Sequence, residues 1–314
     1  MNSTELKGHV AMFSANVMWG LMSPLAKFVI IGGAVSSLVV TDMRIFGAMV
    51  LFWIASFFRK SEYVPPKDMF RLFLASLLAI VLNQGSFITG VGMTSPVDAS
   101  IITTSMPLLV MILSAFFLKE PITGKKVLGI AAGASGALLL ILGSHKSSET
   151  RIVGDNYILG DLLVLFAQFS YACYIVFFKR FVEKYSLFTI MKWMFTYAFI
   201  CILPFSYMDL MQASWDALTI NEILSLLFIV VCSTFISYVC VVIGQKNLRP
   251  TVAGMYNYVQ PVVASVIAIC WGMDSFNLMK VFSVILIFVG VYLVTKSRSR
   301  EDMEKMMKQK SEVQ

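Results

Sequence analysis

Residues 94–140 read TSPVDASIITTSMPLLVMILSAFFLKEPITGKKVLGIAAGASGALLL, and this stretch decides the fold of the chain. Two apolar segments flank a short charged turn, and Pro107 lies in the middle of the first segment. The second segment carries Gly129, Gly133 and Gly136 at helical spacing. We therefore predict two apolar helices joined by a turn. The first has a proline kink, and the second packs its small residues against the first or against the last span of the chain.

The same layout returns 154 positions later along the chain. Seven pairs of residues share this offset: Gly90 and Gly244, Pro96 and Pro250, Ala99 and Ala253, Pro107 and Pro261, Glu120 and Asp274, Lys126 and Lys280, and Gly136 and Gly290. Unrelated residues would not keep one spacing over roughly fifty positions, so the pattern indicates an internal repeat.

The composition is that of a membrane protein. Of the 314 residues, 58% are hydrophobic and 14% are charged, whereas a soluble domain has about 45–50% apolar and about 25% charged residues. Apolar runs of about 20 residues are long enough to cross a hydrocarbon core of about 30 Å. We predict an all-α polytopic membrane protein with ten spans. They lie at about 8–31, 36–58, 69–91, 96–118, 126–143, 158–178, 187–207, 222–244, 251–272 and 278–295.

Lys and Arg residues are distributed unevenly between the two sets of loops. With the N-terminus inside, nineteen of them fall in cytoplasmic segments and three in external ones. Basic residues prefer the cytoplasmic side of short loops, so this split predicts that both termini are cytoplasmic. Each half has five spans, an odd number, so the halves face opposite ways. Such an inverted repeat is typical of secondary transporters.

These observations divide the chain into four parts. The first five-helix repeat covers residues 1–143, an external linker covers 144–157, the second five-helix repeat covers 158–295, and a charged cytoplasmic tail covers 296–314. Such short loops leave no room for a soluble catalytic domain. The net charge of +7 follows from the cytoplasmic loops and does not indicate a nucleic-acid partner. The partners that we expect are the lipid bilayer and a small-molecule substrate, and the chain is either a monomer or a homodimer.

Neither cysteine nor histidine points to a cofactor. The five cysteines all lie inside apolar runs without CxxC spacing, as small buried hydrophobic residues do. Of the two histidines, His9 lies at the very edge of the first predicted span and His145 lies outside the spans. We therefore predict no metal, no haem and no other cofactor within the membrane.

Four charged residues are candidates for a site inside the spans: Lys27, Asp42, Arg44 and Lys192. A charge at the bilayer centre costs about 2.5–3.5 kcal/mol, so it normally faces a cavity or a partner. Lys27 and Lys192 lie near span ends, where snorkelling to the interface is the alternative. Arg44 lies about 12 Å into its span, too deep for snorkelling. Asp42, about 200° from Arg44 around the helix, is the only carboxylate placed clearly inside a span and is our coupling candidate.

Polar residues gather around the two repeated prolines. We predict that Pro107 and Pro261 kink their helices and free the carbonyl groups of Thr103 and Asn257. Tyr256 and Gln260 lie beside the second kink. Further mid-span polar residues are Asn16, Trp19, Asn83, Gln84, Gln168, Tyr171 and Tyr238. Helix–helix hydrogen bonding is the alternative role for any one of them.

The quoted residues resemble one known family. The chain is similar to EamA-type transporters of the drug/metabolite transporter superfamily, in its ten-span branch. The residues that carry the resemblance are Trp19-Gly20 followed by Lys27, Arg44 in the second span, and the run from Thr94 through Pro107 to Gly129. The resemblance implies an inverted repeat with a central cavity bounded chiefly by spans 1–4 and 6–9. It also implies that spans 5 and 10 are peripheral supports.

We expect a secondary transporter that exports a small organic metabolite across the inner (plasma) membrane by alternating access. An amino acid or a related anionic or zwitterionic solute suits the basic residues. The predicted substrate-binding residues are Trp19, Lys27, Arg44, Thr103, Tyr256, Asn257 and Gln260. A nucleotide-sugar or phosphate-ester exchanger is one alternative, and a non-transporting membrane scaffold is another. The spans contain no convergent catalytic constellation, so we predict that the protein is not an enzyme.

Overall fold

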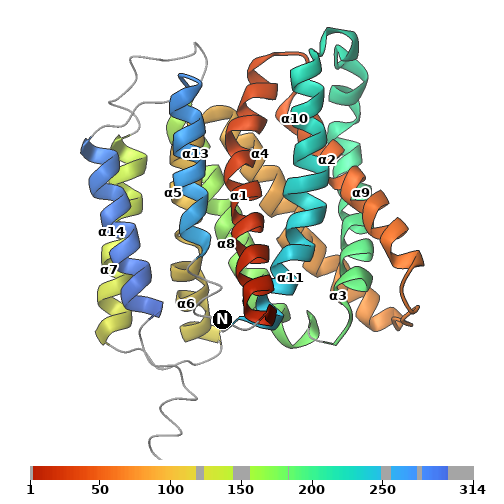
Figure 1. Ribbon diagram of the computed structural model, residues 1–314, viewed down its shortest axis with the longest axis horizontal. Helices are drawn as coiled ribbons and strands as arrows, with labels where there is room; N and C mark the ends of the chain where they lie inside the picture. The colour runs from red at the N-terminus through yellow and green to blue at the C-terminus, as the bar shows by residue number, and fades with distance from the viewer. Residues whose placement is uncertain are drawn as a thin grey trace, which may run out of the picture.

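A computed structural model describes residues 3–117, 124–143, 156–182, 184–248, 256–273 and 278–295. All regular structure in these residues is helical, and the helices stand side by side in one bundle (Figure 1). Within the described ranges, seven helices are long and apolar enough to cross a membrane. Three shorter apolar helices accompany them, at Val127–Gly136, Val259–Cys270 and Val281–Gly290. The predicted all-α membrane fold is therefore confirmed.

The first half of the chain contains eight described elements. They are α1 (Ser3–Ile31), α2 (Ser37–Phe57), α3 (Pro66–Ser76), η1 (Leu77–Leu82), α4 (Asn83–Met93), α5 (Pro96–Thr103), α6 (Met106–Phe117) and α7 (Gly124–Gly143). The described elements of the second half are α8 (Tyr157–Val182), α9 (Leu187–Gln212), η2 (Trp215–Ala217), α10 (Ile220–Val230), η3 (Val231–Ile236), α11 (Ser237–Asn247), η4 (Tyr256–Tyr258), α13 (Val259–Cys270) and α14 (Leu278–Thr295).

Polar residues just outside the apolar runs fix where three helices begin. The Ser36 hydroxyl accepts a hydrogen bond from the Val39 N–H at the start of α2, and Ser186 does the same for Thr189 at the start of α9. Thr219 and Glu222 form a reciprocal capping box at the start of α10. Each cap satisfies N–H groups that have no partner inside the helix, so the start of the helix is set by the sequence.

The 154-residue offset is present in the helices as well as in the sequence. Three consecutive elements of the first half, α3, η1 and α4, recur with identical lengths as α10, η3 and α11. Both η1 and η3 are six-residue π-helical turns, so two spans carry the same wide turn at the same position. No pattern in the sequence predicts these turns; π-helical turns are frequent at functional sites.

Helices that correspond in the repeat run antiparallel to each other. The start of α2 meets the end of α9, where the Ser36 hydroxyl donates to Asp209 at 2.5 Å. Further along, Trp53 Nε1 donates to the Thr196 hydroxyl at 2.9 Å. Two helices with the same place in their repeats therefore cross the bundle in opposite directions.

The pair α7 and α14 is equally antiparallel and lies at one edge of the bundle (Figure 1). A Cβ atom added to Gly290 would meet the backbone of Gly129 and Gly133 at 2.6 Å. A Cβ atom added to Gly136 would meet the Ser283 carbonyl oxygen at 2.8 Å. These contacts are too short for any side chain, so the small residues of α7 serve the contact with the last helix. This is one of the two predicted packing partners.

The repeated prolines interrupt their spans, but differently from the prediction. Helix α5 ends at Thr103 and α6 begins at Met106, so Pro107 lies in the first turn of a new helix. Pro261 likewise lies in the first turn of α13, directly after η4. A proline in a first turn removes an N–H that has no partner there. The predicted mid-helix kink is therefore corrected to a break between two helices.

Candidate functional site

Arg44 is the buried cation at the centre of the candidate site. It lies on α2, is only 4% exposed, and points towards the π-helical turn η3. Its Nε donates a hydrogen bond to the Thr234 hydroxyl oxygen at 2.8 Å. The same hydroxyl donates to the Ile229 carbonyl five residues back, at 2.9 Å. Thr234 therefore holds the guanidinium through a hydroxyl whose own direction is fixed by the wide turn.

The turn η3 also holds α1. Trp19 Nε1 donates to the Ser233 carbonyl oxygen at 3.1 Å, and the Ser233 hydroxyl donates to the Met18 carbonyl oxygen at 2.8 Å. Ser233 and Thr234 are both completely buried. Since a π turn shifts the normal pairing of its carbonyl groups, it can accept such side-chain donors. Two adjacent residues of η3, Ser233 and Thr234, thus fix Trp19 and Arg44 relative to each other.

Two further polar residues complete this region. Gln84 on α4 is 1% exposed, and neither atom of its amide makes a hydrogen bond of good geometry. The Tyr238 hydroxyl on α11 interacts with both Gln84 and Arg44. The Tyr238 ring packs edge-on against Trp19, with ring centroids 6.3 Å apart. We call Trp19, Arg44, Gln84, Thr234 and Tyr238 the central polar cluster.

The central polar cluster has an electrostatic imbalance. Within the described ranges, Arg44 forms no ion pair, and its terminal Nη groups form no hydrogen bond. A buried guanidinium without an anion is costly, because its desolvation is only partly offset by one hydroxyl and the field of nearby dipoles. A carboxylate matches the fork of two parallel N–H donors, so the cluster is suited to bind one.

Asp42 lies on the other side of α2, as predicted. It is 3% exposed and lies near Ser206 on α9, while its Oδ1 has no hydrogen-bond partner. Arg44 faces η3 and Asp42 faces α9, so they are separate features of one helix. A buried carboxyl with an unused oxygen can take up a proton at little structural cost.

Lys27 is buried and lies outside the central polar cluster. It is eight residues beyond Trp19, about 12 Å further along α1. Its ammonium group donates to the Gly92 carbonyl oxygen at 2.7 Å. The nearby Thr94 hydroxyl donates to Asp161 at 2.5 Å. Lys27 therefore does not snorkel to the interface.

The expectation that Asp42 is the only carboxylate clearly inside a span is wrong. Asp98 on α5 and Asp161 on α8 are both buried as well. They lie within the first turn or two of their helices, close to the predicted span ends, which is why the hydropathy pattern did not separate them from the loops.

The predicted site residues near Pro261 lie where α1 packs against η4 and α13. Gln260 donates to the Asn16 side-chain oxygen at 2.8 Å, and the Tyr256 hydroxyl lies 2.7 Å from His9 Nδ1. Asn257 is half-buried beside them. Thr103, on α5, donates to the Ser100 carbonyl oxygen within its own helix.

The structure therefore brings only some of the predicted substrate-binding residues together. Trp19 and Arg44 meet at η3, Gln260 lies about one turn of α1 away from them, and Lys27 and Thr103 lie elsewhere. Gln84 and Tyr238 were noted only as mid-span polar residues. Thr234 was missed, although a Ser-Thr pair inside an apolar run was a usable signal.

Comparison with known proteins identifies the family. The model of the EamA-like transporter family matches the chain twice, over residues 6–142 and 158–296. An uncharacterized transporter of Archaeoglobus fulgidus is 25% identical over 283 residues, which cover 89% of this chain and 95% of that protein. The uncharacterized transporter YoaV of Bacillus subtilis is 24% identical and covers 94% of this chain and 99% of its own length.

A WAT1-related protein of Arabidopsis thaliana is 24% identical over 273 residues, 79% of this chain and 74% of that protein. A crystal structure at 17% identity superimposes with a TM-score of 0.61 and covers 92% of this chain, which supports the fold. The chain belongs to the EamA-like transporter family and is a membrane transporter built from two repeats. The resemblance seen in the sequence is confirmed, and the names of the relatives favour transport over catalysis.

Proposed function

We propose that this member of the EamA-like transporter family is a secondary transporter that exports a small organic metabolite carrying a carboxylate. An amino acid or a related anionic or zwitterionic solute is the expected class. The two repeats, 1–143 and 158–295, would form ten spans of inverted topology. Both termini, including the tail 296–314, would lie on the cytoplasmic side of the cell's inner (plasma) membrane, with the linker 144–157 outside.

The observation that carries the substrate class is the state of Arg44. Its guanidinium is buried in the central polar cluster, is held by Thr234 through Nε only, and has no carboxylate partner in the described part of the chain. Bidentate binding of a substrate carboxylate by the terminal nitrogens would supply the missing anion. The Gln84 amide and the Trp19 and Tyr238 rings would then contact the rest of a small solute.

The antiparallel pairing of corresponding helices supports alternating access. Helices α2 and α9 belong to different halves and contact each other along their length. Rocking of one half against the other would expose the central polar cluster to each side in turn. The close glycine contacts of α7 with α14 support the predicted role of these two helices as peripheral supports.

Asp42 supports coupling to protons. Its buried carboxyl has one oxygen without a partner, so protonation would not break an ion pair or a hydrogen bond of that oxygen. Asn at this position keeps the shape but cannot carry the proton. We therefore expect Asp42→Asn to abolish transport driven by a pH gradient while exchange of labelled for unlabelled solute continues.

Counterflow in liposomes tests the proposal. Purified protein would be assayed with a panel of amino acids, organic anions, nucleotides and sugars, beside the Arg44→Gln variant and the matched surface variant Arg71→Gln. We expect exchange of a carboxylate-bearing solute that Arg44→Gln abolishes and Arg71→Gln retains. Exchange of nucleotide sugars alone would favour the phosphate-ester exchanger, and no exchange of any solute by folded protein would favour a scaffold.

A further inference from the structure

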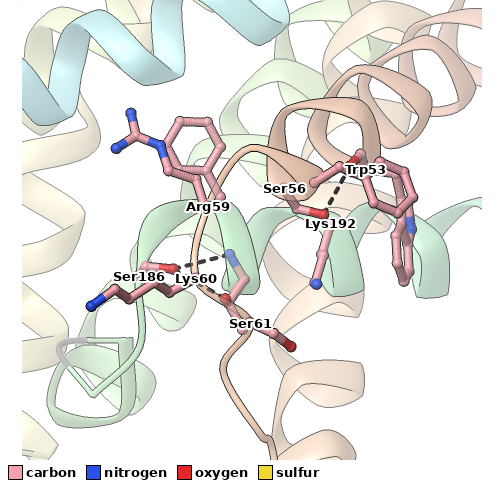
Figure 2. Close-up of a pocket in the computed structure, with 10 residues that line it drawn as sticks. Trp53, Ser56, Arg59, Lys60, Ser61, Ser186 and Lys192 are labelled. Carbon is pink, nitrogen blue, oxygen red and sulfur yellow. Dashed lines mark hydrogen bonds between the residues drawn. The ribbon is translucent and has the colours of Figure 1, made fainter.

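A hollow lined by polar and basic residues lies away from the central polar cluster, where α2 ends and α9 begins. It has a volume of about 260 Å³. Its lining residues are Trp53, Ser56, Phe57, Arg59, Lys60, Ser61, Ser186, Phe188, Thr189 and Lys192. Figure 2 shows the Lys192 ammonium group between Trp53 and Ser61, and Arg59 and Lys60 extending outward on the other side. We call this hollow the α2–α9 pocket.

Three cations line the α2–α9 pocket. None of Arg59, Lys60 and Lys192 forms an ion pair with a carboxylate in the described ranges. Lys192 lies over the Trp53 ring, 4.7 Å from its centroid, and Arg59 lies over the Phe188 ring at 5.1 Å. These aromatic faces hold both cations in place without neutralising them.

Glu62, which directly follows the lining residue Ser61 in the chain, already has partners among the described residues. Glu62 accepts hydrogen bonds from the N–H and the hydroxyl of Ser186, both at 3.0 Å. Burial alone would raise the pKa of the Glu62 carboxyl, but hydrogen bonds from Thr189 and Ser186 and the charge of Lys192 hold that pKa below its usual range. Glu62 therefore stays ionised and caps the start of α9, and the pocket keeps a net positive charge.

The surroundings of the pocket indicate the depth at which it opens. Phe57, Phe58 and Tyr63 are 77%, 84% and 83% exposed, directly beside it in the chain. Trp53 is half-buried in its wall. Exposed aromatic residues next to basic ones mark the zone of lipid headgroups at the end of a span. A ligand in the pocket would thus lie where phospholipid phosphates lie, while its acyl chains could pass along the apolar outside of α2.

We propose that the α2–α9 pocket binds the phosphodiester headgroup of an anionic phospholipid. Arg59 and Lys60 attract the phosphate at the rim, and Lys192 faces it from the inner wall. The Ser61 hydroxyl belongs to the same lining and can donate a hydrogen bond to the glycerol or phosphate oxygens. This site is separate from the transported substrate, because it lies at the end of the bundle and its cations do not belong to the central polar cluster.

Native mass spectrometry of the purified full chain tests the proposal. The probe is phosphatidylglycerol, titrated against phosphatidylcholine of the same acyl chains. The test variant is Arg59→Gln with Lys60→Gln. The matched control is Lys67→Gln with Lys125→Gln, which removes two exposed charges outside the pocket lining. We expect the wild type and the control variant to retain phosphatidylglycerol in preference to phosphatidylcholine. The test variant should bind phosphatidylglycerol at least about tenfold more weakly than the wild type does.

Equal loss in test and control variants would show that only diffuse charge attracts the lipid, and unchanged binding in both would also overturn the proposal. A third arm adds millimolar inorganic phosphate or glycerol phosphate. Displacement of the lipid by either one would assign the pocket to a soluble phosphate instead. Lys192→Gln probes the inner wall and is expected to weaken binding as well. No transported solute enters this experiment, so its result is independent of the proposed function.

Discussion

The two π-helical turns, η1 and η3, have the same place in the repeat but different chemistry. Their residues are related by the 154-residue offset, and both are flanked by 11-residue helices of matching bounds. At the positions where η3 has Ser233 and Thr234, η1 has Ala79 and Ile80. The backbone geometry is repeated, whereas the polar groups that meet Arg44 are found in the second half alone.

Because of this difference in residue type, the two turns make different hydrogen bonds with their neighbouring helices. In the first half, α8 supplies the polar groups: the Ser170 hydroxyl donates to the Leu78 carbonyl oxygen at 2.7 Å. In the second half, η3 supplies them itself and holds Trp19 and Arg44. Gln84 and Tyr238 follow the two turns at corresponding positions, and they interact with each other. A symmetric scaffold therefore holds an asymmetric polar cluster. In our proposal, η1 serves packing and η3 positions the binding residues.

Removing the hydroxyl of Thr234 should reveal the largest difference between η1 and η3 in their effect on substrate exchange. Thr234→Val keeps the shape but takes away the acceptor for Arg44 Nε. A hydrogen bond to a charged group is worth about 1.5–3 kcal/mol, so the rate of substrate exchange should fall about 10- to 100-fold. Ile80→Val, the change at the corresponding position of η1, should leave exchange within about twofold. Similar losses in both variants would mean that the turns do not differ in function.

The residues that follow the turns should show a trade-off between stability and transport. Gln84→Leu removes a buried amide without well-formed hydrogen bonds, so the free energy of unfolding should rise by about 1 kcal/mol. Exchange should fall about tenfold if the amide contacts the solute. Thermal unfolding and counterflow of the same preparation measure both effects. A less stable Gln84→Leu protein would show that the amide serves packing. Tyr238→Phe is the companion variant and should lower exchange without adding stability.

The smallest effect is expected from the serine hydroxyls that join each turn to its neighbour. Ser170→Ala and Ser233→Ala each remove one hydrogen bond to a backbone carbonyl group, worth about 1 kcal/mol of stability. Only Ser233→Ala should also change substrate affinity, because Ser233 lies beside Trp19 and Thr234. Equal affinities of the two variants would argue against a special role for η3.

Much of the fold was predictable, because hydropathy and the 154-residue offset are properties of the sequence itself. The burial of Arg44 was predictable from its depth in an apolar span, whereas its role in a binding site stays a prediction. The π turns were not predictable, because their sequences, LLAIVL and VCSTFI, share no pattern that marks a π turn. Without η3, the proximity of Thr234 to Arg44 could not be inferred.

The mid-helix kinks at Pro107 and Pro261 were the least accurate expectation. Proline indicates that a normal helical turn is interrupted, but it fits a first turn as well as a mid-helix kink. Both Pro107 and Pro261 lie in the first turn of a helix. Thr103 bonds within its own helix, and Gln260 pairs with Asn16. Most of the turn at 119–126, most of the linker at 144–157, most of the second repeat's loop at 274–280 and the whole tail lie outside the described residues.

The central claim is that Arg44, held by η3, binds the carboxylate of the transported solute. Isothermal titration of purified protein with the solute identified by counterflow, and with its carboxamide analogue, tests this directly. In wild type, loss of the carboxylate should weaken binding about 100-fold, whereas Arg44→Gln should bind the two ligands within about twofold of each other. A folded Arg44→Gln protein that still prefers the carboxylate as strongly as wild type would contradict the claim.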